Sequence, residues 1–227
     1  MIIEGEKQHP HAARRLRESV ASDSGISVRL VTDRALKEGA YAISRDGDAI
    51  EVRGGPFSGV IYGVEELIER GGRHLDPAFL GQGTVSGEPG LAYRTFWTWD
   101  HSTNWELSQI GQQEIGVFNP FQKPPKGFLD DYKRLVDFCS KNRIAAIVIY
   151  GFLRDSHGGI EAAQELCRYA NERGVRIIPG IAIGAYGGVY WEGNHRYNLA
   201  TWLKENPQHA AKMEKGVGFQ IADLAFP

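Results

Sequence analysis

Hydrophobic and polar residues follow two patterns along this chain, and strict alternation dominates its N-terminal part. Residues 26–31 alternate between apolar and polar side chains and predict a strand. Residues 41–53 hold two alternating runs on either side of Asp46-Gly47, and because both of these residues tolerate a positive φ, the segment predicts a β-hairpin. Residues 11–22 and 58–70 carry apolar side chains at helical spacing and predict two helices.

The second of these helices has recognisable ends. Ser58 precedes it as a candidate N-cap, and Gly71 follows it as a stop signal. Residues 73–76 can return as a short strand. The segment 81–87 contains three glycines, but their spacing differs from a dinucleotide-binding fingerprint and no helix follows, so we interpret it as a linker. Residues 1–88 are therefore expected to form a small α+β domain.

The rest of the chain alternates strands with helices. Residues 144–150 form an unbroken apolar run, which is typical of a parallel strand that is covered on both faces. Regular alternation of this kind predicts βα units and hence an α/β fold. The predicted elements are strand 94–100, helix 128–140, strand 144–150, helix 160–173, strand 175–183 and a helical segment at 199–215.

The strand at 94–100 indicates which α/β fold to expect. It is rich in aromatic and β-branched residues and ends in Trp99-Asp100, where the chain becomes polar. Such a change at the carboxyl end of a strand is typical of (β/α)8 barrels, whose sites are built there. We therefore predict that residues 89–227 form the first three to four strands of a TIM (β/α)8 barrel.

A complete barrel of this kind takes about 250 residues, more than the chain offers after residue 88. The sequence is therefore expected to be the N-terminal part of a larger enzyme. Three or four parallel strands by themselves would leave an unpaired apolar edge. On this hypothesis, residues 1–227 in isolation should be poorly soluble or self-associated.

Composition and charge argue against several classes of partner. The formal net charge is −2, whereas a nucleic-acid-binding surface needs an excess of Lys and Arg. No apolar run approaches the ~20 residues of a membrane span, and the first residues lack the features of a signal peptide. We expect a cytoplasmic protein, unless a leader precedes the chain. Cys139 and Cys167 lie at apolar positions of predicted helices and are expected to be buried thiols.

Two motifs resemble a known group of enzymes. The run Gly59-Val-Ile-Tyr-Gly-Val-Glu-Glu-Leu-Ile68 follows a hairpin and a Gly-Gly pair. It resembles the helix that closes the zincin-like N-terminal accessory domain of family 20 β-hexosaminidases and family 67 α-glucuronidases. Leu91-Ala-Tyr-Arg94, which leads into the strand with Trp99-Asp100, is similar to the way the catalytic barrels of these enzymes begin.

The resemblance implies a glycoside hydrolase with a (β/α)8 catalytic domain. In such enzymes the catalytic carboxylates lie on the fourth strand or later, and no carboxylate of this chain matches a family catalytic motif. No catalytic residue is therefore assigned. The zincin-like domain does not imply zinc, because the sequence contains no His-Glu-x-x-His motif. No cofactor and no metal are predicted.

Aromatic and polar residues follow each of the three predicted strands. Sugars present hydroxyls at the ring edge and C–H groups on the ring face, so this mixture suits a carbohydrate pocket. Arg154 could also hold the carboxylate of a uronic acid. The expected substrate-binding residues are Trp97, Trp99, Asp100, His101, Asn104, Arg154, Tyr186, Trp191, Glu192 and His195.

Several of these residues have simpler interpretations. Trp97 is also compatible with the hydrophobic core, since successive strand side chains alternate between faces. Asp100 could cap a turn or face Glu192 as a pair of carboxylates for glycoside hydrolysis. Asp100, His101, Glu192 and His195 have the ligand types of a metal site but no diagnostic spacing.

Three functions compete on this evidence. The first is a glycoside hydrolase that acts on glycans containing uronic acids or N-acetylhexosamines and is inactive without its later strands. The second is a non-catalytic carbohydrate-binding module, and the third is a metal-dependent hydrolase or isomerase on a similar barrel. The first two of these functions require a glycan as the binding partner. The sequence leaves the oligomeric state open, including a homo-oligomer.

Overall fold

The structure is a computed structural model, and it describes residues 1–21, 25–46, 49–81, 83–91, 93–99, 125–150, 152, 158–180 and 204–209. Contacts between Cα atoms divide the chain into two compact units. Unit 1 comprises Met1–Thr95, Leu135–Ala146 and Arg168–Arg176. Unit 2 comprises Phe96–Arg134, Ile147–Cys167 and Ile177–Pro227. The fold class is α/β, as predicted.

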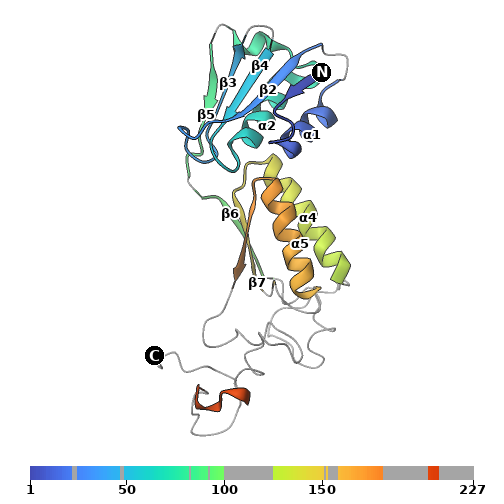
Figure 1. Cartoon of the computed structure of the whole chain (residues 1–227), viewed down its shortest axis with the longest axis vertical. Coiled ribbons are helices and arrows are strands. Elements are labelled where there is room, and N and C mark those ends of the chain that lie inside the picture. Colours follow the sequence, from blue (N-terminus) through green and yellow to red (C-terminus); the bar gives the residue numbers. More distant parts are fainter. Residues whose placement is uncertain are drawn as a thin grey trace. The chain divides into compact units, whose positions relative to one another are not determined.

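A five-stranded sheet forms the centre of unit 1, with the strand order β1-β2-β4-β3-β5 (Figure 1). The first three strands of this order run parallel to one another, and β3 is antiparallel to both of its neighbours. The strands are β1 Ile2–Glu4, β2 Ser27–Thr32, β3 Tyr41–Asp46, β4 Ala49–Gly54 and β5 Val85–Gly87.

The predicted hairpin is confirmed by the pairing of β3 with β4. Ile43 lies opposite Val52, and Asp46 lies opposite Ala49 next to the turn. The alternation in the sequence becomes alternation of burial: Ile43 and Val52 are fully buried, whereas Arg53 is exposed. A shift of one residue in this register would move the buried set to the other face, so the apolar face fixes the register.

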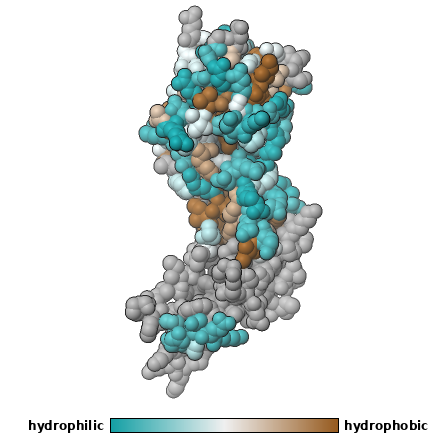
Figure 2. Space-filling model, viewed as in Figure 1, coloured by the Kyte–Doolittle hydropathy of each residue, from teal (hydrophilic) through white to brown (hydrophobic). Residues whose placement is uncertain are grey.

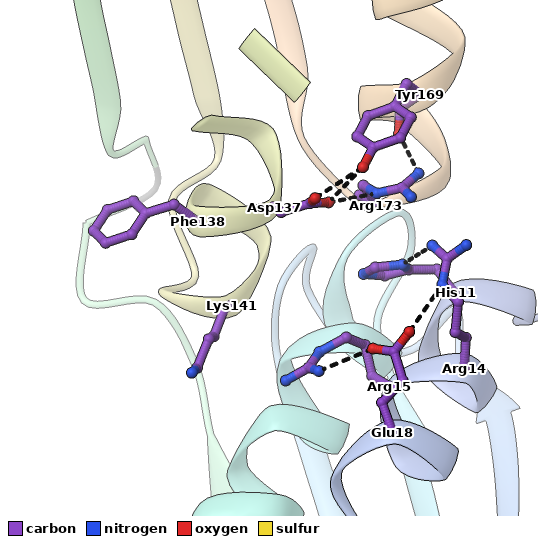
Figure 3. A pocket seen from close by; sticks show the side chains of 9 residues that line it. All are labelled: His11, Arg14, Arg15, Glu18, Asp137, Phe138, Lys141, Tyr169 and Arg173. Atoms are coloured by element: carbon purple, nitrogen blue, oxygen red, sulfur yellow. Dashed lines mark hydrogen bonds and ion pairs between the residues drawn. The ribbon is translucent and has the colours of Figure 1, made fainter. Parts of the chain in front are cut away.

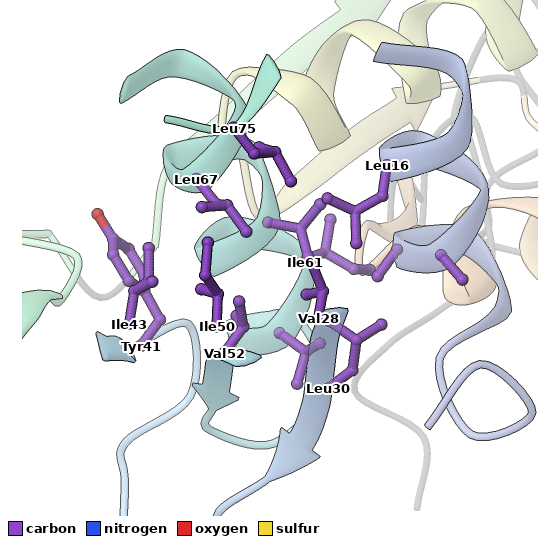
Figure 4. Close-up of a cluster of buried hydrophobic side chains, with 14 of the residues drawn as sticks. Leu16, Val28, Leu30, Tyr41, Ile43, Ile50, Val52, Ile61, Leu67 and Leu75 are labelled. Carbon is purple, nitrogen blue, oxygen red and sulfur yellow. The ribbon is translucent and has the colours of Figure 1, made fainter. Parts of the chain in front are cut away.

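Two predicted helices cover one face of this sheet, α1 (Pro10–Ser19) and α2 (Gly59–Gly71). Their apolar side chains meet those of the strands in a single core (Figure 4). Leu16 of α1, Leu67 of α2 and Val28 of β2 have no exposed surface there. Burial of each such side chain contributes about 1.5–3 kcal/mol, so the sheet and both helices depend on one another.

A close-packed bend joins β4 to α2 and explains the glycines that precede this helix. A Cβ atom on Gly54 would lie 1.9 Å from the Val60 backbone nitrogen, and one on Gly55 would lie 1.8 Å from the Lys37 carbonyl oxygen. Phe57 adopts a φ of 67°, which is rare for a bulky residue. Only glycine fits at positions 54 and 55, because a side chain at either position would collide with backbone atoms.

Two local predictions in this region are wrong. Residues 73–76 do not form a strand; the chain forms the 3-10 helices η1 (Gly72–His74) and η2 (Pro77–Leu80) instead. Asp76 caps η2, since its carboxylate accepts a hydrogen bond of 2.9 Å from the Ala78 backbone N–H. The predicted linker at 81–87 ends in strand β5, which pairs with β3. A three-residue edge strand is too short to show alternation in the sequence.

The ends of α2 also differ from the prediction. Ser58 occupies the N-cap position, but its side chain makes no capping hydrogen bond to the helix. The helix continues through Gly71, and Gly72 closes it with a φ of 63°. A positive φ is accessible to glycine without a steric penalty, so the second glycine of the pair is the stop signal.

The second sheet has three strands in the order β6-β7-β8. The Ala145 N–H donates to the Arg94 carbonyl at 2.9 Å, and the Arg176 N–H donates to the Ala145 carbonyl at 2.9 Å. These bonds connect the beginnings of all three strands, so the strands run parallel. Its elements are β6 Thr95–Trp99, α4 Pro125–Lys141, β7 Ala146–Tyr150, α5 Gly159–Glu172 and β8 Arg176–Gly180.

These elements confirm the predicted succession of strands and helices between residues 94 and 180, and the last three residues of the predicted strand 175–183 lie outside the described residues. The buried stripe of α5 consists of Ala163, Leu166 and Ala170. Cys139 on α4 is buried as predicted, but Cys167 is exposed. Each helical residue turns about 100° from the one before, and the stripe is centred on Leu166, so the next residue lies outside it.

The predicted helical segment at 199–215 is described only at 204–209, where η5 (Pro207–His209) follows Asn206. The remainder of that prediction lies outside the described residues. No helix of the described ranges is both long enough and apolar enough to cross a bilayer.

Candidate functional site

Most of the predicted substrate-binding residues lie outside the part of the chain that the structure describes. Trp97 is fully described, and Trp99 is described only as the last backbone position of β6. The two alternative sites, the carboxylate pair and the metal site, also lie outside it. The residues concerned are Asp100, His101, Asn104, Arg154, Tyr186, Trp191, Glu192 and His195.

A chain of hydrogen bonds fixes the orientation of β6. The Thr98 hydroxyl donates to the Val148 carbonyl of β7 at 3.0 Å, and it lies 2.8 Å from the hydroxyl of Tyr132 on α4. Since a hydroxyl has a single proton, the Tyr132 hydroxyl is the donor in the second bond. The side chain of Thr98 therefore points toward α4.

Trp97 consequently belongs to the other face of β6, because successive side chains of a strand point to opposite faces. Its side chain is 57% exposed. In the view of Figure 2, the described surface is mostly hydrophilic and its hydrophobic residues form separate patches. The exposed large hydrophobic residues at or just before β6 are Leu91, Tyr93, Phe96 and Trp97.

The carboxyl ends of the three parallel strands lie at the same edge of their sheet. These ends are Trp99 of β6, Tyr150 of β7 and Gly180 of β8. Ligands of parallel α/β sheets bind outside this edge, because the loops that leave it converge there. Trp97 and Trp99 belong to β6, and the other predicted site residues lie in the segments that follow these three positions in the sequence.

A polar cavity of about 500 Å³ lies within unit 1 and was not predicted from the sequence (Figure 3). Its walls come from α1, from the last turns of α4 and from the end of α5. The lining residues are His11, Arg14, Arg15, Glu18, Asp137, Phe138, Lys141, Tyr169 and Arg173.

His11 is almost fully buried in the wall of this cavity, with 6% of its surface exposed. An Arg14 nitrogen lies 2.8 Å from its Nδ1, and the Ser140 hydroxyl lies 3.3 Å from its Nε2. A guanidinium only donates hydrogen bonds, so Nδ1 accepts and the ring proton is on Nε2. Ser140 then donates to the Arg173 carbonyl oxygen at 2.8 Å.

His11 is therefore held neutral. Burial, followed by the positive charges of Arg173 and Arg14, lowers the pKa of His11 from 6.5 to about 3. A protonated imidazole would also turn Nδ1 into a donor that faces the donor of Arg14. The neutral ring instead helps to fix the Arg14 guanidinium.

Two further arginines of the cavity are fixed by carboxylates. Arg15 makes a bidentate contact with Glu65 of α2, at 2.6 and 3.1 Å, and Glu65 is only 1% exposed. Arg173 lies 2.8 Å from Asp137 and stacks its guanidinium 3.3 Å from the ring centre of Tyr169. The cations are thus preorganised by groups that come from several elements.

The sequence contained a signal for this cavity. His11, Arg14, Arg15 and Glu18 are spaced at helical intervals along α1 and share one side of it. A charged helix face of this kind is more often exposed to solvent than part of a cavity, so the spacing alone does not identify a site. Within the described ranges, no group of three or more His, Cys, Asp or Glu side chains is arranged to hold a metal ion.

No protein-family model matches this chain, and no curated protein matches it either. Solved structures of carbohydrate-active enzymes do. The family 20 β-N-acetylhexosaminidase of Streptomyces coelicolor A3(2) is 14% identical with a TM-score of 0.54, and the match covers 98% of this chain and 49% of that one. The β-N-acetylhexosaminidase of Bacteroides fragilis is 16% identical with a TM-score of 0.52, and the match covers 98% and 45%.

A family 138 glycoside hydrolase that targets pectin rhamnogalacturonan II is also similar, at 18% identity and a TM-score of 0.52. This match covers 78% of the present chain and 23% of that enzyme. The chain thus spans less than half of the length of each of these structures. At such identities the likeness concerns the fold: this chain has a fold that occurs in parts of glycoside hydrolases.

Proposed function

We propose that this chain is part of a glycoside hydrolase. The observation that carries the proposal is the structural likeness to β-N-acetylhexosaminidases over 98% of the chain. In this proposal residues 1–88 are an accessory domain of the zincin-like type, and residues 89–227 contribute the first strands of a (β/α)8 barrel. The parallel order of β6, β7 and β8 supports this assignment.

The proposed substrate is a glycan, bound at the carboxyl ends of these strands. Trp97 supports this idea, since it is exposed on the face of β6 opposite the one from which Thr98 contacts α4. An aromatic ring on this face can stack on the C–H face of a sugar. The sites proposed around it are those that follow the strands: Trp99, Asp100, His101, Asn104, Arg154, Tyr186, Trp191, Glu192 and His195.

N-Acetylhexosamines and uronic acids are the proposed sugar classes. The similarity to β-N-acetylhexosaminidases favours N-acetylhexosamines. Arg154 and the histidines would instead suit the carboxylate of a uronic acid. Most glycoside hydrolases use two carboxyl groups about 5–5.5 Å apart for retention or about 6.5–9.5 Å apart for inversion. We assign sugar binding to this chain and no proton-transfer step to a particular residue.

The proposal is tested by the affinity of the chain for a neutral N-acetylglucosamine oligosaccharide, measured by calorimetry. Trp97→Ala should weaken binding by about tenfold, because stacking of an aromatic ring contributes about 1 kcal/mol or more. Phe138→Ala is the matched control: this ring is 51% exposed but lies on α4. Equal affinities of the wild type and Trp97→Ala would count against the proposed pocket.

A non-catalytic carbohydrate-binding module is the second candidate, because an exposed Trp97 would serve it equally well. Hydrolysis separates the two functions. Release of sugar from an aryl N-acetylglucosaminide or an aryl glucuronide, by this chain or by any longer chain that contains it, supports the enzyme. Binding with no release from either substrate supports the module.

A further inference from the structure

The cavity of unit 1 contains more positive than negative charge, although the chain as a whole has a formal net charge of −2. Four cationic side chains line it against two carboxylates, and two further carboxylates outside the lining, Glu65 and Glu172, pair with Arg15 and Arg173. A volume of about 500 Å³ is within the range of small-molecule sites. A ligand can bind most strongly to those cations that no carboxylate of the protein already neutralises.

Two of the cations have close carboxylate partners. Arg15 is paired with the buried Glu65 behind the cavity wall and also lies 3.3 Å from Glu18. Arg173 is paired with Asp137 at 2.8 Å. Figure 3 shows the contacts of Arg15 with Glu18 and of Arg173 with Asp137 in two separate groups; Glu65 does not line the cavity and is not drawn.

The other two cations are compensated weakly or not at all. Arg14 is held by the neutral imidazole of His11, and its carboxylate contact is a distance of 3.9 Å to Glu18. The ammonium group of Lys141 makes no hydrogen bond or ion pair within the part of the chain that the structure describes, and no dashed line reaches it in Figure 3. The uncompensated charge of the cavity therefore belongs to Arg14 and Lys141.

We propose that this cavity is a binding site for a small anionic ligand, with Arg14 and Lys141 as the two cations of the lining that attract its phosphate, sulfate or carboxylate group. Arg14 comes from α1 and Lys141 from the end of α4, and both contribute donors for charge-assisted hydrogen bonds. Arg14 is fixed in advance by His11, which reduces the entropy lost on binding. The inference does not depend on the proposed glycosidase function.

Titrations of the full chain at constant ionic strength test this site. Inorganic phosphate, sulfate and glucuronate are added separately, with chloride as the compensating ion, and binding is followed by calorimetry and by amide chemical shifts. At least one of the three should bind saturably and shift the amides of α1 and the end of α4. The anion that binds most tightly identifies the group that the site accepts.

Three variants separate this site from general charge screening. Lys141→Met and Arg14→Gln should each weaken binding by about tenfold, and Gln retains an N–H donor for His11. Glu18→Gln should tighten binding, because it removes a carboxylate from the lining. Lys7→Met, an exposed lysine that does not line the cavity, should bind as the wild type does.

Two results would overturn the proposal. One is the absence of saturable binding by all three anions. The other is an equal loss of affinity in Lys7→Met and Lys141→Met, which would indicate screening of the whole surface. Lys141 is exposed, so its variant should fold; circular dichroism and the melting temperature establish this before the titration.

Discussion

At the scale of single residues, His11 shows how burial decides chemistry. The imidazole is an ordinary helix residue in the sequence, yet in the structure it accepts from Arg14 and donates to Ser140. Sequence reasoning places the backbone of such a residue correctly but not its partners. Ser140 is 129 positions away along the chain, so only the fold brings the two together.

The lowered pKa of His11 predicts a pH-dependent stability. Its pKa is about 3 in the folded state against an ordinary value of 6.5, so between these values the unfolded chain binds the additional proton. The stability associated with the neutral His11 is fully present above pH 6.5 and is lost as the pH falls toward 3. The free energy of unfolding, measured with urea, should fall between pH 7 and pH 4 in both proteins. This fall should be smaller in His11→Gln than in the wild type, by roughly 2–3 kcal/mol.

Glutamine is a suitable replacement because it can accept from Arg14 and donate to Ser140 without gaining a proton. All other titrating groups are the same in both proteins. Their shared pH dependence cancels in the comparison. Parallel pH profiles of the two proteins would mean that His11 is protonated in the folded state or is not buried as described.

The bend before α2 gives a second prediction at the residue scale. Gly55→Ala should destabilise the chain by about 3 kcal/mol, because its Cβ atom would lie 1.8 Å from the Lys37 carbonyl oxygen. Gly90→Ala is the control, since no atom lies within 4 Å of a Cβ at that position. Thermal and urea unfolding measure both effects. A Gly55→Ala variant as stable as Gly90→Ala would contradict the close packing.

At the scale of elements, the hydrophobic pattern predicted the helices and most of the strands. The hairpin at Asp46-Gly47 and the apolar strand β7 were correct because each carries its signal within a few adjacent residues. Strand β5 was missed because its place in the sheet depends on a partner, β3, that lies far away in the sequence. The predicted site shares this difficulty, since it requires loops from different strands to converge.

Helix α2 contains an unforeseen buried charge. Its apolar stripe was predicted, but Glu65 is also buried and is paired with Arg15 of α1. Glu65→Ala should cost about 3 kcal/mol, since it leaves a partly buried guanidinium without its partner. Glu69→Ala on the same helix should cost less than about 1 kcal/mol, because this residue is 54% exposed. Chemical unfolding of the two variants measures the difference.

A double variant provides the control for this pair. Arg15→Met with Glu65→Met removes both charges and replaces them with apolar side chains of similar length. It should recover much of the stability that Glu65→Ala loses, because no buried charge is left uncompensated. A double variant less stable than Glu65→Ala would show that the pair itself, rather than the orphaned arginine, determines the loss.

At the scale of the molecule, charged contacts within unit 1 hold the beginnings of the parallel strands. Arg143, just before β7, lies 2.8 Å from Glu69 and 2.9 Å from Glu66. Arg176, the first residue of β8, lies 2.7 Å from Glu38 and stacks on the Phe57 ring at 4.1 Å. These contacts lie at the beginnings of the strands. The loops, and the proposed ligand, are at the opposite, carboxyl ends.

Glycan binding at the carboxyl ends of β6, β7 and β8 is the proposal from which the function of the chain follows. Its most direct test is the set of backbone amide shifts when an N-acetylglucosamine oligosaccharide or glucuronate is titrated into the chain. We expect shifts at and after Trp99, Tyr150 and Gly180, with little change at the strand beginnings Thr95, Ala146 and Arg176. Saturable binding of sugar with its shifts confined to the strand beginnings, or no binding of either sugar, would contradict it.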